Sequence, residues 1–251
     1  MIELEGAFNL KLDTVTAEAL GPDPLSSTEG VDRMSLWQRG EHGLMGLSVL
    51  LLILSGMALA YHQQAWAQVL IQCMGGIAGR HLVHRIGAIG LLVAGVLHLG
   101  GFLFSQRHRR DFGRVLLRPS DLTEGWRGIR SAFSESSPAP RYGWFTPMQK
   151  VQYWGVLFGC LLMGISGVWL WFPATALQLF PKWVFDAMLV IHAKEAQLIF
   201  VGFIIWHLYD VHIAGGNFPM NPAWLTGKMS AESFALQHRD SSVSGRLGEK
   251  P

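Results

Sequence analysis

The chain has 251 residues, half of them hydrophobic and only 15% charged, with a formal net charge of +2. A soluble domain of this length carries closer to a quarter charged residues, and here the charges are kept apart from long stretches that hold almost none. This composition argues against a soluble enzyme and favours a single integral membrane domain.

The first segment is polar and acidic, with eight Asp or Glu residues against three Lys or Arg in residues 1–41. It lacks the basic and apolar regions of a cleavable signal peptide. We expect an N-terminal acidic arm at 1–34, a membrane domain at 35–240 and a flexible tail at 241–251.

Four apolar stretches follow the arm, at Leu44–Ala60, Ile86–Phe104, Val151–Phe172 and Val184–Tyr209. Each approaches or exceeds the ~20 residues that a helix needs to cross a bilayer. Because lipid offers no hydrogen-bond partners, such spans are helical. The predicted fold is all-α, an integral membrane four-helix bundle, with a soluble bundle of buried helices as the alternative.

The loops differ sharply in basic residues. Residues 105–150 carry nine Lys or Arg, whereas the links at 61–84 and 173–183 carry one each. Because basic loops stay in the cytoplasm, we expect both termini on that side (N-in, C-in). The basic loop indicates topology and not nucleic-acid binding.

The ten histidines include several that fall within the spans or at their ends. His42 stands at the inner end of the first span, and His84 and His98 at the outer and inner ends of the second. His192 and His207 lie in the outer and inner parts of the fourth. Ionisable residues in a membrane span are costly and point to a functional site.

Depth sorts these histidines into two layers. His192 and His207 are 15 residues apart, ~22 Å along a helix and on roughly one face. His84 can meet His192 near the outer surface, and His42 can meet His207 near the inner one. Two imidazoles from different helices at one depth are what six-coordinate haem iron needs.

Other metal centres fit less well. Cys73 and Cys160 are the only cysteines and no CxxCH motif occurs, which excludes covalent c-type haem. No Cys, Asp or Glu accompanies the histidines at zinc or copper spacing. The alternative from another class is a non-redox membrane anchor or transporter with histidines as a proton relay.

Several short motifs follow one another in a fixed order along the chain. They are Arg39-Gly40-Glu41-His42 and Leu54-Ser55-Gly56, Gly79-Arg80 through His84 to Gly87, Gln149-Lys150 and Gly167-Val168-Trp169, Ile191-His192-Ala193 and His207-Leu208-Tyr209, and Gly227-Lys228-Met229-Ser230. This ordered set resembles the cytochrome b (gamma) subunits of respiratory formate dehydrogenases and the related nickel–iron hydrogenase cytochrome b subunits, over residues 36–238.

The resemblance implies axial ligand roles for His42, His84, His192 and His207. It implies two b haems, an outer one on His84 and His192 and an inner one on His42 and His207. It also implies a quinone site (menaquinone or ubiquinone) beside the inner haem. The protein would then be a membrane-anchoring subunit in the bacterial inner membrane, passing electrons between quinone and a periplasm-facing redox subunit with iron–sulfur clusters or c-type haems. A stand-alone cytochrome b561-type carrier is the alternative within the redox class, and substrate chemistry would lie on the partner.

Departures from that pattern leave other roles open. His98 has no counterpart in the formate dehydrogenase pattern, and it could replace His42 as a ligand, support a third haem or bond a quinone. The fourth span separates its histidines by one residue more than the family does. Thr146-Pro147-Met148 replaces the family's Asn-x-Gly near the quinone pocket.

Secondary candidates follow from charge and position. Arg39 and Arg85 lie within three residues of proposed ligands and could pair with haem propionates, or could simply lie at the membrane edge. His212 and Gln149 are candidates for binding a quinone near the inner surface. Leu54-Ser55-Gly56 is echoed by Ile165-Ser166-Gly167, which fits either close helix packing or the approach of a flat cofactor.

Overall fold

Four long helices dominate the computed structural model, which describes residues 30–133, 142–213, 218–230 and 233–234. Three of them are α1 (Leu36–Ala60), α3 (Gly76–Phe104) and α6 (Pro147–Trp171). The fourth is continuous over Lys182–His212 and consists of α8 (Lys182–Gly202), a π-helical turn η1 (Phe203–His207) and α9 (Leu208–His212). The predicted four-helix membrane bundle is confirmed.

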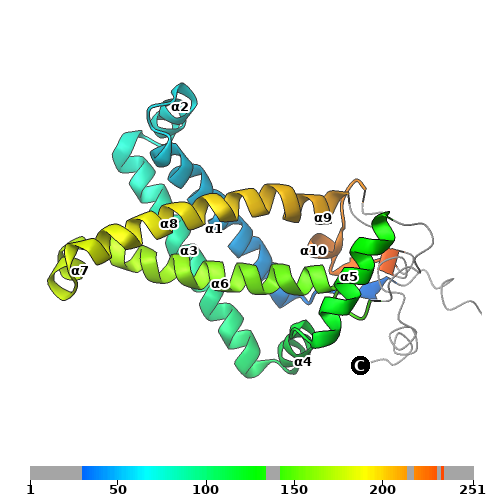
Figure 1. The fold of residues 1–251 in the computed structure, drawn as a ribbon. Coiled ribbons are helices and arrows are strands. Elements are labelled where there is room, and N and C mark those ends of the chain that lie inside the picture. Colours follow the sequence, from blue (N-terminus) through cyan, green and yellow to red (C-terminus); the bar gives the residue numbers. More distant parts are fainter. Residues whose placement is uncertain (1–29, 134–141, 214–217, 231–232, 235–251) are drawn as a thin grey trace, which may run out of the picture.

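The helices form two hairpins that cross each other (Figure 1). The short helix α2 (Ala65–Cys73) joins α1 to α3, and α7 (Pro173–Leu179) joins α6 to α8. Both short helices lie at one end of the bundle in Figure 1. The opposite end carries α4 (Gln106–Val115), α5 (Pro119–Phe133), α10 (Ala223–Thr226) and the strand pair β1 (Val31–Asp32) and β2 (Lys228–Met229).

Both hairpins start with the same N-terminal device. At α1, the Ser35 hydroxyl accepts the backbone N–H of Gln38, and the Gln38 side chain accepts the backbone N–H of Ser35. At α6, Thr146 and Gln149 make the same reciprocal pair. Such a capping box satisfies two otherwise unpaired N–H groups, and it explains why both helices start several residues before their apolar stretches.

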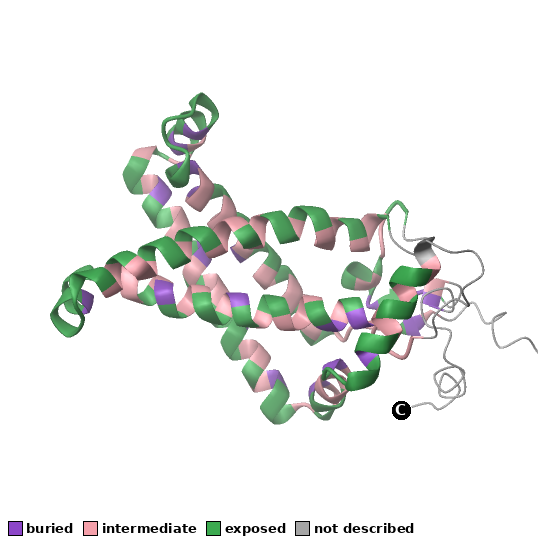
Figure 2. Ribbon diagram, in the orientation of Figure 1, coloured by how far each residue is buried: buried purple, intermediate pink, exposed green. Residues whose placement is uncertain are grey.

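The surface of the long helices is suited to lipid. At most 17% of the apolar stretch of any of them is buried within the protein, and exposed residues run along all four (Figure 2). Large apolar side chains in water at this density would form an aggregating surface. In a bilayer the same side chains are covered by lipid.

The end that carries α4 and α5 is fastened by buried polar contacts. Lys150 at the start of α6 donates to Asp121 of α5 at 2.7 Å, and both side chains are under 10% exposed. Val31 pairs with Met229 in the two-stranded sheet. Arg33 packs over the Trp144 ring, and burial lowers the pKa of its guanidinium to about 10. Most of the predicted N-terminal arm and the whole C-terminal tail lie outside the described residues.

Candidate haem sites

The outer layer brings one histidine from each hairpin together. The ring centroids of His84 (α3) and His192 (α8) are 6.4 Å apart. Two imidazoles bonded at about 2 Å to opposite sides of one metal ion have ring centroids about 6 Å apart. The two rings therefore stand at the separation that an axial ligand pair requires.

Two serines determine which ring nitrogen of each histidine is free. The Ser55 hydroxyl donates to the Leu51 carbonyl at 2.6 Å and lies 2.9 Å from Nδ1 of His84. Since its only hydrogen is used, the oxygen accepts the Nδ1–H of the ring. The protonated Nδ1 leaves the Nε2 lone pair available for iron.

The second hairpin repeats this arrangement. Ser166 donates to the Leu162 carbonyl at 2.8 Å, and its oxygen lies 2.9 Å from Nδ1 of His192. Both serines are fully buried. The glycine after each serine faces the same ring, since a Cβ on Gly56 would lie 3.6 Å from His84 and one on Gly167 would lie 3.3 Å from His192.

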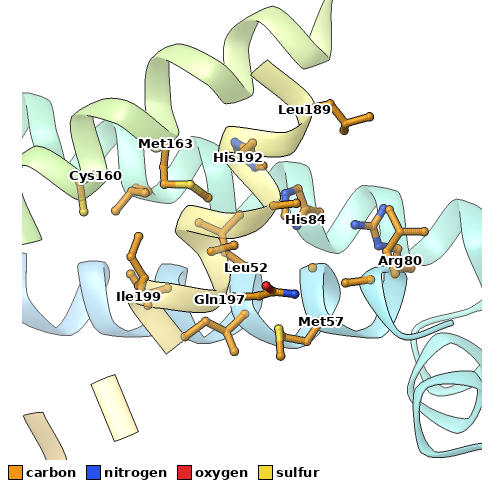
Figure 3. A pocket seen from close by; sticks show the side chains of 18 residues that line it. Leu52, Met57, Arg80, His84, Cys160, Met163, Leu189, His192, Gln197 and Ile199 are labelled. Atoms are coloured by element: carbon orange, nitrogen blue, oxygen red, sulfur yellow. The ribbon is translucent and has the colours of Figure 1, made fainter. Parts of the chain in front are cut away.

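A cavity of about 310 Å³ adjoins the outer pair. Figure 3 shows His84 and His192 beside it, with apolar and sulfur-containing side chains around them. Its other lining residues include Leu52, Met57, Cys160, Met163, Ala196 and Ile199. Arg80 also lines it, is 5% exposed, and donates through Nε to the Ser55 carbonyl at 2.7 Å. An apolar cavity with a few convergent polar groups is the usual form of a cofactor site.

The inner layer holds a second histidine pair. The ring centroids of His42 (α1) and His207 (η1) are 6.1 Å apart. The Gln152 amide lies 3.1 Å from Nδ1 of His207. Nδ1 of His42 is buried and has no hydrogen-bond partner among the described residues. At ~1.5 Å per residue this layer lies ~22 Å from the outer one along the fourth helix.

The π turn explains the wide spacing of the fourth span. Phe203–His207 forms one π-helical turn, which holds one residue more than the α-helical ladder. The extra residue between His192 and His207 is thereby absorbed, and His207 still faces His42.

The remaining sequence-predicted residues lie elsewhere. His98 does not pair with His207. Its Nε2 lies 3.1 Å from the Tyr153 hydroxyl, and its Nδ1 lies 3.6 Å from Glu41. The same Glu41 carboxylate accepts the Trp37 indole N–H at 2.6 Å and lies 3.5 Å from His108.

Three secondary candidates make contacts outside the two histidine pairs. The Arg85 guanidinium lies over the Trp171 ring at 5.2 Å, and Arg39 donates to the Leu225 carbonyl. Nδ1 of His212 lies 2.9 Å from the Pro219 carbonyl oxygen.

Comparison with known families agrees with this geometry. A family model described as prokaryotic cytochrome b561, which covers the cytochrome b subunits of nickel–iron hydrogenases and formate dehydrogenases, matches residues 33–215. The chain belongs to this family. It is therefore a bacterial membrane cytochrome b and an electron carrier, and the cofactor of the family is haem b. No curated protein matches the chain significantly.

The cytochrome also contains polar groups that the sequence did not single out. Ser55 and Ser166 appeared only as small residues in a repeated motif, and Arg80 only as part of a longer one. Gln152, which contacts His207, was not considered, while its neighbour Gln149 is used in the capping box. The signal that could have identified the serines is their position: each lies one residue before a glycine that packs on a histidine ring.

Proposed function

We propose that this cytochrome binds two b haems, one between His84 and His192 and one between His42 and His207. The observation that carries the proposal is the presence of two histidine pairs at two depths, each with its ring centroids 6.1–6.4 Å apart. When bound, haem b supplies a one-electron couple, and two haems form a path across most of the bilayer.

The side chains around each pair support this assignment. Ser55 and Ser166 hold the outer rings with Nε2 free, as the hydrogen-bond partners of metal-bound histidines do. Arg80 places a cation at the edge of the outer cavity, where it suits an anionic propionate. Gln152 can hold one ring of the inner pair in the same way, because its amide oxygen can accept the Nδ1–H of His207 when the amide is turned.

The proposed role is electron transfer between a periplasm-facing redox subunit and the quinone pool. Two electrons delivered singly, together with two protons from the aqueous inner side, convert one quinone to one quinol, and the reverse reaction uses the same path. The membrane-anchoring role, N-in and C-in, is supported by the nine Lys or Arg of residues 105–150. Substrate chemistry would take place on the partner subunit.

Purified protein tests the proposal directly. A pyridine haemochrome assay should give two haem b per chain, and a quinol analogue should reduce them. Absence of haem b would favour the proton-relay transporter instead. The family match also favours a stand-alone cytochrome b561-type carrier as a second candidate. Purification of the tagged protein from its own membranes separates the two, since only the subunit brings a redox partner with it.

A further inference from the structure

The two hairpins have the same arrangement of polar residues. Helices α1 and α6 each have 25 residues, and an offset of 111 residues in sequence aligns seven polar or glycine positions at their caps and along them. The matched pairs are Ser35 and Thr146, Gln38 and Gln149, Arg39 and Lys150, Glu41 and Gln152, His42 and Tyr153, Ser55 and Ser166, and Gly56 and Gly167. The match includes both capping boxes and both serines that hold a histidine.

The second helix of each hairpin follows the same plan. His84 and His192 are equivalent, because each receives its Nδ1 contact from the matched serine of its own hairpin. Fourteen residues further on, α3 has His98. The equivalent residue of the fourth helix is His207, fifteen residues on, since the π turn adds one residue.

This equivalence gives the inner layer two related sites. In the first, His207 faces His42 with ring centroids 6.1 Å apart, and its Nδ1 contacts Gln152. In the second, His98 faces Tyr153, also at 6.1 Å. Its Nδ1 contacts Glu41, the counterpart of Gln152, at 3.6 Å.

The second site has different chemistry from the first. A tyrosine hydroxyl replaces the second imidazole, and it lies 3.1 Å from Nε2 of His98. A hydrogen bond of this length leaves no room for an iron ion between the two groups. The imidazole and the hydroxyl can both hydrogen-bond a carbonyl oxygen. The His98 side chain is 43% exposed, so a molecule dissolved in the lipid can reach it.

We propose that His98 of α3 and Tyr153 of α6 together bind the head group of a quinone, with one quinone carbonyl hydrogen-bonded by these two side chains. The site rests on the proposed function, since its electrons come from the inner haem. It adjoins that haem, because Glu41 and Tyr153 are the chain neighbours of His42 and Gln152. This site is not the one expected from the sequence at His212 or Gln149, because the side chains of those two residues contact Pro219 and Thr146.

Tyr153→Phe tests the site with the smallest change, removal of one hydroxyl. The assay follows oxidation of the reduced, purified cytochrome by a short-chain quinone. We expect the KM for the quinone to rise about 10-fold, because the variant loses about one hydrogen bond to it. Haem content, midpoint potentials and the rate with ferricyanide should stay unchanged. His98→Gln should act similarly. Tyr209→Phe, the same change at a tyrosine that is 53% exposed, is the matched control and should leave KM unchanged.

Three results would overturn the site. One is a wild-type KM in both Tyr153→Phe and His98→Gln, and another is a rise in KM only in His212→Ala. The third is the loss of one haem from three in His98→Gln, which would make His98 an iron ligand. Absence of haem b from the wild-type protein is a separate outcome, which would refute the proposed function itself.

Discussion

Ser166 shows how a single hydroxyl sets the chemistry of an imidazole. Its oxygen accepts the Nδ1–H of His192 because its own hydrogen is given to the helix. A ring that donates such a bond is a stronger electron donor through Nε2. With a haem bound between His84 and His192, as proposed, this hydrogen bond would stabilise ferric over ferrous iron.

Ser166→Ala should raise the midpoint potential of the outer haem and leave the inner one unchanged. If the preference for ferric iron falls tenfold, the midpoint potential rises by about 59 mV for a one-electron couple. The affinity of the outer site for haem should also fall about 10-fold. Redox titration of the purified variant measures both. Ser48→Ala, at another buried serine, is the control. An unchanged outer potential in Ser166→Ala would contradict the role of the hydroxyl.

The residue scale is also where sequence reasoning was least complete. Depth alone suggested that His42 could meet His207, since helix rise is fixed. It could not choose between His42 and His98, which stand at one depth on different helices. The choice depends on how the hairpins cross, and a single helix does not encode that. Gln152 was missed for the same reason.

At the scale of elements, the hydrophobic pattern predicted the carboxyl ends of α1, α3 and α6 to within one residue. Their starts were placed eight, ten and four residues late, because the first turns are polar and are held by capping or by links that the pattern does not reveal. The short helices α2 and α7 were not predicted. The π turn was visible only as an unexplained extra residue.

Deletion of Ile204 tests that explanation of the π turn. The variant should form a regular α-helix with His192 and His207 14 residues apart and keep both haems. Deletion of Ile204 and Ile205 together should turn His207 by ~100° away from His42, and the inner haem should be lost. Haem per chain and the redox spectrum measure both variants. Loss of the inner haem on the single deletion would mean that the π turn itself shapes the site.

At the scale of the whole molecule, the two ends of the bundle differ in charge. The end with α4 and α5 holds the basic segment and is proposed to face the cytoplasm. The opposite end holds α2 and α7, which present exposed apolar residues such as Trp66, Val69 and Leu179. An apolar surface with little charge suits a permanent subunit contact. We therefore expect the redox partner to dock over α2 and α7, close to the outer haem.

Labelling of cysteines in intact cells that produce the cytochrome without its redox partner, which would otherwise cover α2, tests this orientation. Cys73 in α2 is exposed and should react with a membrane-impermeant maleimide added from the periplasmic side. A cysteine placed in α5 by Ser131→Cys, in a Cys73→Ser background, should react only after the inner membrane is opened. The reverse pattern would invert the proposed topology and move the partner to the other face.

The central claim is that two separate histidine pairs hold two haems, and His192→Ala and His42→Ala test it most directly as a matched pair. We expect each purified variant to retain one haem b per chain, because the two layers are ~22 Å apart along the helix. Redox titration should show that His192→Ala loses one midpoint and His42→Ala loses the other. Loss of both haems from a variant that remains folded, or loss of the same midpoint in both variants, would contradict the account.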